Sequence, residues 1–306
     1  MKREGRFWRD LKEHKMLLLM FLPGLLYFII FHYLPMYGTV LAFKDFRISE
    51  GIWGSPWVGF RHFEYAFDDL GFINALRNTL IISLLKLVLG FPAPIIFAIL
   101  LNEIGRSTFK KFVQTVSYLP HFISWVVLGG VFISFLSLNG PLNLILEMFG
   151  FAPRIFMSEE NGFVAILILT DIWKGFGWGA IIYIAALAGL DPSMYEAAVI
   201  DGANRWHRIR YITLPSLVPV MTILIILSMS GILDAGFDQI FNMYNSRVVD
   251  VSEIIDTYVY KKGLVDADYS YATAIGLFKS IVALVMIVIS NKIANTIRGK
   301  EADALW

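Results

Sequence analysis

The sequence predicts an all-α integral membrane protein with six transmembrane helices. Apolar residues make up 57% of its 306 positions, whereas soluble chains hold about 45–50%. Charged residues make up only 17%, against about 25% in a soluble chain. A soluble fold of this length could not bury so much apolar surface in one core, so much of that surface is expected to face membrane lipid.

Six segments are long and apolar enough to cross a bilayer, which takes about 20 mostly apolar residues. The first segment is not a cleaved signal peptide, because its apolar stretch is too long and five further spans follow. Polar or aromatic loops separate the six segments. The expected spans are residues 16–43, 76–101, 112–138, 163–190, 214–236 and 271–293.

Lysine and arginine residues predict the orientation of these spans. If the spans alternate in direction, nearly twice as many basic residues lie on the side of the N-terminus as on the opposite side. Because cytoplasmic loops carry such an excess, both termini are expected to be cytoplasmic. Residues 1–15 then form an amphipathic segment on the inner leaflet or, alternatively, a disordered basic tail. Residues 294–306 form a cytoplasmic tail.

Several kinds of functional site are absent from the sequence. The chain has no cysteine, which excludes disulfides, thiolate zinc sites and thiol catalysis. Its five histidines form no metal-ligand pair, and no glycine-rich motif is suited to phosphate binding. The net charge is only +1, with no long basic tract for nucleic acid. We therefore expect no catalytic residue, metal or cofactor on this chain, and no nucleic-acid partner.

The loop between the fourth and fifth expected spans, residues 191–213, is the most informative stretch. Its start favours a short helix, because Asp191 is a suitable N-cap and Pro192 suits the first helical position. Gly202 is expected to end this helix. A second helical piece follows, and Leu214–Pro215 is expected to begin the fifth span.

This loop carries a spaced motif. Glu196, Ala197 and Ala198 are followed, after three residues, by Gly202. After nine more residues comes a short apolar motif that contains Ile212, Leu214 and Pro215. The pattern resembles the signature loop of permease subunits in binding-protein-dependent type I ABC importers, and every fixed position matches at the correct spacing. In that family the loop is the coupling helix, which docks in a groove of the cytoplasmic ATPase. By this resemblance these residues, with Asp201, form the ATPase-coupling loop.

The resemblance also implies partners and a location. The chain would pair with a second, homologous permease subunit, more plausibly a different chain than a copy of itself. Two cytoplasmic ABC ATPase subunits would use ATP and Mg²⁺, and an extracytoplasmic binding protein would deliver the substrate. Transport would proceed by alternating access in a bacterial or archaeal plasma membrane.

A second motif narrows the substrate class. It lies in residues 57–80, before and within the second expected span, and consists of Gly59, Phe60, Phe63, Phe72, Ala75, Asn78 and Thr79. This spacing resembles sugar permeases of the maltose group, although an aromatic interfacial loop is an alternative interpretation. The alternatives for function are an ABC permease for a peptide, an amino acid or a polyamine, an ion-coupled secondary transporter, and a membrane enzyme. A secondary transporter predicts inverted repeats, and none is evident.

Four ionisable residues are expected near the middle of the bilayer: Lys86, Asp171, Lys174 and Lys279. Asp171, Lys174 and Trp178 share one helix face, so all five residues are candidates for the substrate pathway. Trp178 would stack on sugar rings while the charged groups bind hydroxyls. Three lysines against one aspartate favour a substrate that carries carboxylates, such as an acidic oligosaccharide. The alternative is that Asp171 only pairs with Lys174 or Lys86.

Two acidic residues are expected one helical turn apart near the outer end of the fifth span, Asp234 and Asp238. They would line the outer mouth of the pathway beneath a docked binding protein. The alternative is that they mark a hydrated helix end.

Overall fold

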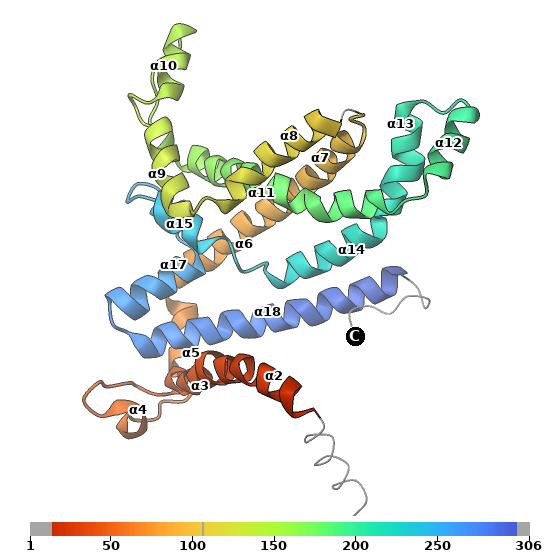
Figure 1. Ribbon diagram of the computed structural model, residues 1–306. Helices are drawn as coiled ribbons and strands as arrows, with labels where there is room; N and C mark the ends of the chain where they lie inside the picture. Colours follow the sequence, from red (N-terminus) through yellow and green to blue (C-terminus); the bar gives the residue numbers. More distant parts are fainter. Residues whose placement is uncertain (1–13, 106, 299–306) are drawn as a thin grey trace, which may run out of the picture.

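The computed structural model describes residues 14–105 and 107–298, and helices make up most of them (Figure 1). Among these residues, β-structure is limited to one isolated antiparallel bridge between Lys44 and Trp57. Most of the expected N-terminal segment 1–15 and of the tail 294–306 lies outside the described residues. The protein is all-α, as predicted.

Five helical segments are long and apolar enough to span a membrane, and a bent pair of helices provides a sixth. The five are Lys15–Phe43, Leu70–Asn102, Gly162–Ala188, Arg205–Met229 and Tyr269–Lys292. The bent pair consists of Ser107–Phe122 and Trp125–Phe135. The second span begins at Leu70 rather than at residue 76, because the side chain of Asp69 accepts a hydrogen bond from the N–H of Gly71 and caps the helix.

Two spans each lie within one helix, α11 or α18, and the others are built from shorter elements, some of which are 3-10 or π turns. The elements of the first half are α2 (Lys15–Phe28), η1 (Ile29–Tyr33), α3 (Leu34–Met36), η2 (Tyr37–Phe43), α4 (Gly51–Gly54), α5 (Arg61–Asp68), α6 (Leu70–Gly90), α7 (Pro92–Asn102), α8 (Ser107–Tyr118), η3 (Leu119–Phe122), α9 (Trp125–Phe135) and α10 (Pro141–Met148). The elements that follow are η4 (Phe156–Ser158), α11 (Glu160–Ala188), α12 (Pro192–Ile200), α13 (Arg205–Arg208), η5 (Ile209–Thr213), α14 (Leu214–Ser230), α15 (Phe237–Met243), α16 (Val249–Ser252), α17 (Ile255–Tyr260), η6 (Lys261–Val265) and α18 (Tyr269–Arg298).

The third span is bent within its expected limits, residues 112–138. The helix turns by 100° between η3 and α9. Pro120 lies in η3 and lacks an N–H for the helical ladder, and Ser124 starts a new helix by accepting a hydrogen bond from the N–H of Val127. Hydropathy over a window of 20 residues locates such a span but does not detect a change of helix direction.

The fifth span differs from its predicted limits, residues 214–236, at both ends. The helix already begins at Arg205, because the side chain of Asn204 accepts a hydrogen bond from the N–H of His207. It ends at Ser230, and a non-helical stretch follows as far as Gly236, which has a φ of +92°. A positive φ suits glycine and interrupts a helix, so α15 starts in a new direction.

Two Leu-Pro pairs, Leu34–Pro35 and Leu214–Pro215, each follow directly after a π turn. The N–H of Leu34 bonds to the carbonyl of Ile29, and the N–H of Leu214 bonds to the carbonyl of Ile209, both five residues back. Pro35 and Pro215 follow, and neither can donate a hydrogen bond. The widened turn gives each proline ring room without ending the helix.

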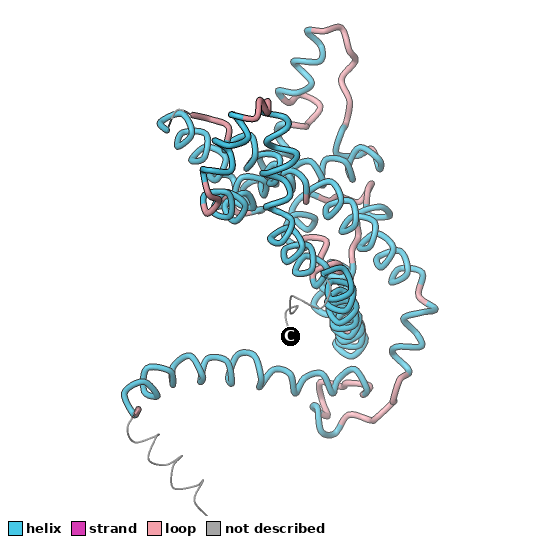
Figure 2. Tube along the Cα trace, turned by 90° about the vertical axis from the view of Figure 1, so that its right-hand side faces the viewer, coloured by secondary structure: helices cyan, strands magenta, loops and turns pink. Residues whose placement is uncertain are grey.

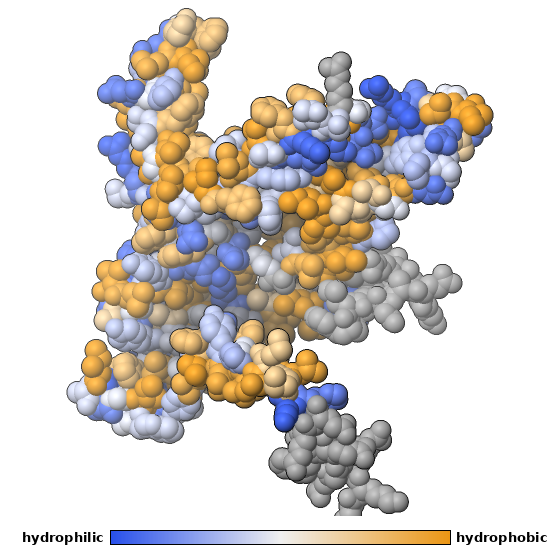
Figure 3. Space-filling model, viewed as in Figure 1, coloured by the Kyte–Doolittle hydropathy of each residue, from blue (hydrophilic) through white to orange (hydrophobic). Residues whose placement is uncertain are grey.

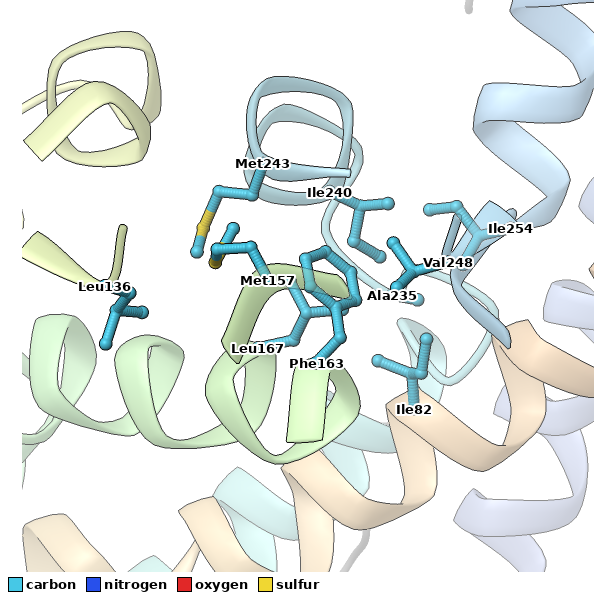
Figure 4. Packing of buried hydrophobic residues seen from close by; sticks show 10 residues of the cluster. All are labelled: Ile82, Leu136, Met157, Phe163, Leu167, Ala235, Ile240, Met243, Val248 and Ile254. Atoms are coloured by element: carbon cyan, nitrogen blue, oxygen red, sulfur yellow. The ribbon is translucent and has the colours of Figure 1, made fainter. Parts of the chain in front are cut away.

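Helices α6, α7, α11, α14 and α18 run side by side as the main bundle (Figure 1). Three buried clusters hold them together. The first joins α6, α11 and α15 through residues that include Ile82, Phe163, Leu167, Ile240 and Met243 (Figure 4). The second joins α5, α6, α17 and α18, and the third joins α7, α11 and α14.

The first span packs differently from the others. All described residues of α2 are exposed, and Figure 2 shows this end of the span standing clear of the bundle. The other end makes contact, because η2 packs against α18. The N–H of Phe46, just after η2, donates to the hydroxyl of Ser270 at 2.9 Å. The first and last spans are therefore neighbours in space.

Candidate functional site

The loop of residues 191–213 forms the helix that the sequence predicts. Asp191 accepts a hydrogen bond from the N–H of Ser193 at 2.9 Å and caps α12, with Pro192 in its first turn. This hydrogen bond lowers the pKa of Asp191. Gly202 ends the helix with a φ of +80°. Figure 3 shows that hydrophilic residues gather at the end of the molecule that carries α12 and α13.

One face of helix α12 is exposed, and the other packs against the rest of the chain. Met194, Ala197 and Ile200 are exposed, and Ile200 is 86% accessible. Tyr195 and Ala198 are half-buried and face the rest of the chain. Of the residues predicted for the coupling loop, Glu196, Ala197, Asp201 and Gly202 are exposed. Ala198 is half-buried within α12, and the other three lie after the turn, in η5 and at the start of α14: Ile212, Leu214 and Pro215.

A groove of about 520 Å³ lies between α6, α7, α11 and α14. Three of the charged residues singled out in the sequence line it: Lys86, Asp171 and Asp234. Ser83, one turn before Lys86, also lines it and is 5% exposed, and its hydroxyl has no hydrogen-bond partner among the described residues. Ser83 was missed by sequence reasoning, because a single serine in an apolar helix is not distinctive.

Lys86 is the centre of a polar cluster at the break in the fifth span. Its ammonium lies 3.3 Å from the carboxylate of Asp171 and donates to the carbonyl of Ala235 at 2.8 Å. It also donates to Oε1 of Gln239, whose amide donates to the carbonyl of Leu167 at 2.7 Å. The lysine side chain is 10% exposed, so the groove presents mainly the Asp171 carboxylate, which is 39% exposed.

Lys174 and Trp178 do not line the groove, although Lys174 lies one turn from Asp171. The ammonium of Lys174 donates to the carbonyls of Pro120 and His121 at 3.4 and 2.8 Å. These carbonyls lie at the bend of the third span, and the lysine adds a side-chain donor there. The carbonyl of Pro120 also accepts a hydrogen bond from the N–H of Ile123 at 3.2 Å. Trp178 stacks on the ring of His121, with centroids 4.5 Å apart.

Lys279 also has a partner of its own. Its ammonium donates to the carboxylate of Asp256 on α17 at 2.5 Å. The sequence gave no signal for this pair, because residue 256 lies in a predicted outer loop and was not set against the spans. The residues predicted for one pathway are therefore divided among three places in the structure.

Asp234 and Asp238 do not lie on one helix end, so that prediction is wrong. Asp234 is in the non-helical stretch and accepts a hydrogen bond from the N–H of Gly236 at 3.2 Å. Asp238 is on α15, beyond the break. The physical reason is that the turn at Gly236 separates the two residues, which a continuous helix would have placed on one face.

Uncharged polar residues of the second motif also hold breaks in the backbone, a role that the motif did not predict. The amide of Asn78 donates to the carbonyls of Asp250 and Glu253 at 2.9 and 3.1 Å, where α16 ends. The hydroxyl of Thr79 accepts from the N–H of Ile255 at 2.8 Å, where α17 begins. The Asn-Thr pair of the second motif thus fixes the outer segment to α6.

Spanning helices surround a groove that charged residues line, and an exposed helix, α12, lies at one end. This architecture is that of a membrane transport subunit. Residues 90–299 match the family of binding-protein-dependent transport system inner membrane components, and the chain belongs to that family. Membership excludes the secondary transporter considered above.

Relatives and solved structures match almost the whole chain. The polygalacturonan/rhamnogalacturonan transport system permease protein YteP of Bacillus subtilis (strain 168) is 43% identical over 96% of this chain and 92% of its own length. The structure of a bacterial ABC transporter involved in the import of the acidic polysaccharide alginate covers 96% of this chain and 100% of that chain, with 39% identity and a TM-score of 0.89. A bacterial alginate ABC transporter in complex with an alginate pentasaccharide-bound periplasmic protein covers 95% of this chain and 98% of that chain, with 39% identity and a TM-score of 0.88.

Proposed function

We propose that this chain forms one half of the pathway through which an ATP-driven importer takes up acidic oligosaccharides. The observation that carries the proposal is the likeness, at 39% identity and a TM-score of 0.89, to a transporter involved in alginate import. The similarity to a polygalacturonan/rhamnogalacturonan permease points to the same chemistry, since both named substrates are acidic polysaccharides.

In this proposal the chain works by alternating access with three kinds of partner. A binding protein delivers the oligosaccharide to the outer face, and a second permease subunit completes the pathway. Two ATPase subunits on the cytoplasmic side use ATP and Mg²⁺ and contact the exposed face of α12. Both termini lie in the cytoplasm, and the assembly sits in the plasma membrane. No cofactor is bound by this chain itself.

The groove supports a role in contacting sugar hydroxyls. The hydroxyl of Ser83 lacks a partner among the described residues, and the Asp171 carboxylate is partly open to the groove. Both can accept hydrogen bonds from a sugar. The ammonium groups of Lys86, Lys174 and Lys279 are each bonded to acceptors within the chain. An excess of positive charge among these lysines is therefore not an argument for an acidic substrate.

Reconstitution of the complete transporter tests the proposal. The complex would be placed in proteoliposomes with its binding protein and given oligogalacturonides, alginate oligosaccharides, and carboxyl-reduced versions of the same lengths. We expect uptake and stimulation of ATP hydrolysis by acidic oligosaccharides and at least tenfold less with the reduced ones. Equal uptake of the neutral versions would refute acidic selectivity, and uptake of peptides or polyamines instead would refute a carbohydrate substrate.

A further inference from the structure

We propose that the hydrogen bond between Tyr195 and Thr213 transmits movement of the coupling helix α12 to the spanning helix α14. The hydroxyl of Tyr195 lies 3.0 Å from Oγ1 of Thr213. The inference rests on the coupling role proposed for α12 and assigns a positioning function to two residues outside its exposed docking face.

The connection between α12 and the rest of the chain is sparse. Tyr195 and Ala198 are its half-buried residues, while the others in the helix are exposed. Among the described residues, the Tyr195–Thr213 bond is the side-chain hydrogen bond that joins α12 to the helix beginning at Arg205. The backbone between them bends at Gly202, which has a φ of +80°. A displacement of α12 therefore reaches the next helix through this contact as well as through a bent backbone.

Thr213 is well placed to receive such a displacement. It is 1% exposed and lies in the π turn η5, where its hydroxyl is also 3.4 Å from the carbonyl of Arg208. The helix continues from this turn through α14 to the break in the fifth span. Leu224 and Ser228, near the far end of α14, line the groove. The contact thus lies at one end of a continuous helical segment whose other end forms part of the groove wall.

Three substitutions separate transmission from ordinary stabilisation. Tyr195→Phe keeps the aromatic ring and removes the hydroxyl, and Thr213→Val keeps the branched shape and removes its partner. Thr213→Ser keeps the hydroxyl. Tyr211→Phe is a matched control, because Tyr211 is a neighbouring tyrosine that is 71% exposed and its hydroxyl makes no hydrogen bond among the described residues.

The measurement is substrate transported per ATP hydrolysed by the complete transporter in proteoliposomes. We expect Tyr195→Phe and Thr213→Val each to lower this ratio about fivefold, the effect of one net hydrogen bond, and the double variant to lower it no further. Thr213→Ser and Tyr211→Phe should match the wild type. Co-purification with the ATPase should be unchanged in every variant, because the exposed face of α12 is intact.

A covalent bridge provides an independent test. Because the chain has no cysteine, Tyr195→Cys with Thr213→Cys can be joined by a thiol-specific reagent about as long as a tyrosine side chain. Bridging should restore the transport-to-ATP ratio that the unbridged pair has lost. Unchanged ratios in the single variants, additive losses in the double variant, or failure of the bridge to restore coupling would overturn the inference. A wild-type complex that does not couple transport to ATP would instead refute the proposed function and the inference with it.

Discussion

The breaks in the third and fifth spans are each held by one lysine, but the two lysines do different work. At the third span, Lys174 donates to two backbone carbonyls and has no carboxylate within ion-pair distance among the described residues. At the fifth span, Lys86 donates to one carbonyl and also pairs with Asp171. A carbonyl needs a donor, whereas a carboxylate needs a charge. Lys86 and Lys174 are both lysines within apolar spans, but we expect that an uncharged hydrogen-bond donor can replace Lys174 and not Lys86.

The largest expected effect comes from Lys86→Met. Removing the ammonium leaves Asp171 without its partner and Ala235 without its donor, so we expect about 3 kcal/mol less stability, the lower end for a broken buried pair because Asp171 is partly exposed. Thermal unfolding of the purified complex measures it. Lys86→Gln should remain destabilised, whereas adding Asp171→Leu to Lys86→Met should recover most of the loss. A fully stable Lys86→Gln variant would contradict the distinction between the two lysines.

The packing beside the third-span break gives the next effect. A Cβ added at Gly177 would lie 2.1 Å from the carbonyl oxygen of Ser117 on α8, which is backbone and cannot move aside alone. Gly177→Ala should therefore cost about 1–3 kcal/mol through forced separation of α8 and α11. Gly175→Ala is the control, because nothing lies within 4 Å of its added Cβ. Equal unfolding temperatures for the two variants would argue against this close packing.

Lys174→Met should have a smaller effect than Lys86→Met. It leaves the carbonyls of Pro120 and His121 without a side-chain donor, at a cost of about 1–2 kcal/mol. Lys174→Gln should recover most of that stability, because an amide also donates hydrogen bonds. The same thermal unfolding assay decides the point. If glutamine proves no better than methionine here, the positive charge matters and the contrast with Lys86 is lost.

The smallest expected effect is a pH dependence of stability at Asp69, whose carboxylate accepts hydrogen bonds from Tyr258 on α17 and Tyr271 on α18. Burial raises the pKa of Asp69, but hydrogen bonds from Tyr258, Tyr271 and the N–H of Gly71 outweigh it, so the pKa lies below its ordinary value of 3.8. This contribution is present above the ordinary pKa and is lost as the pH falls through the folded one. Unfolding temperatures at about pH 6 and about pH 3 should differ less in Tyr258→Phe than in the wild type. Equal pH dependence in both would contradict it.

The residues that could be predicted from sequence are those whose role depends on near neighbours in the chain. Asp191, Pro192 and Gly202 start and end α12 through contacts within a few residues, so their pattern is sufficient. The breaks could not be predicted in this way. The carbonyl of His121 at the bend accepts a hydrogen bond from Lys174, 53 residues later, and only the packed structure brings the two together.

Pairing between elements explains the other errors. Asp256 lies outside the spans, yet it meets Lys279 because α17 packs back against α18. Counting charges within spans alone therefore overstated the excess of lysine, and among the three lysines Lys174 is the one that bonds to carbonyls rather than to a carboxylate. Asn78, Ser83 and Gln239 hold or line positions where helices end, and because they are uncharged their sequence positions did not predict this role.

The contact between the first and last spans has a consequence for biosynthesis. The first span leaves the ribosome early, but its neighbour α18 and the hydroxyl of Ser270, which binds the N–H of Phe46 across 224 positions, are made only near the end of translation. Through synthesis of the intervening spans the first helix must rest against lipid or another protein. The chain closes this long-range contact late, so truncation before residue 269 removes the partner of its first span.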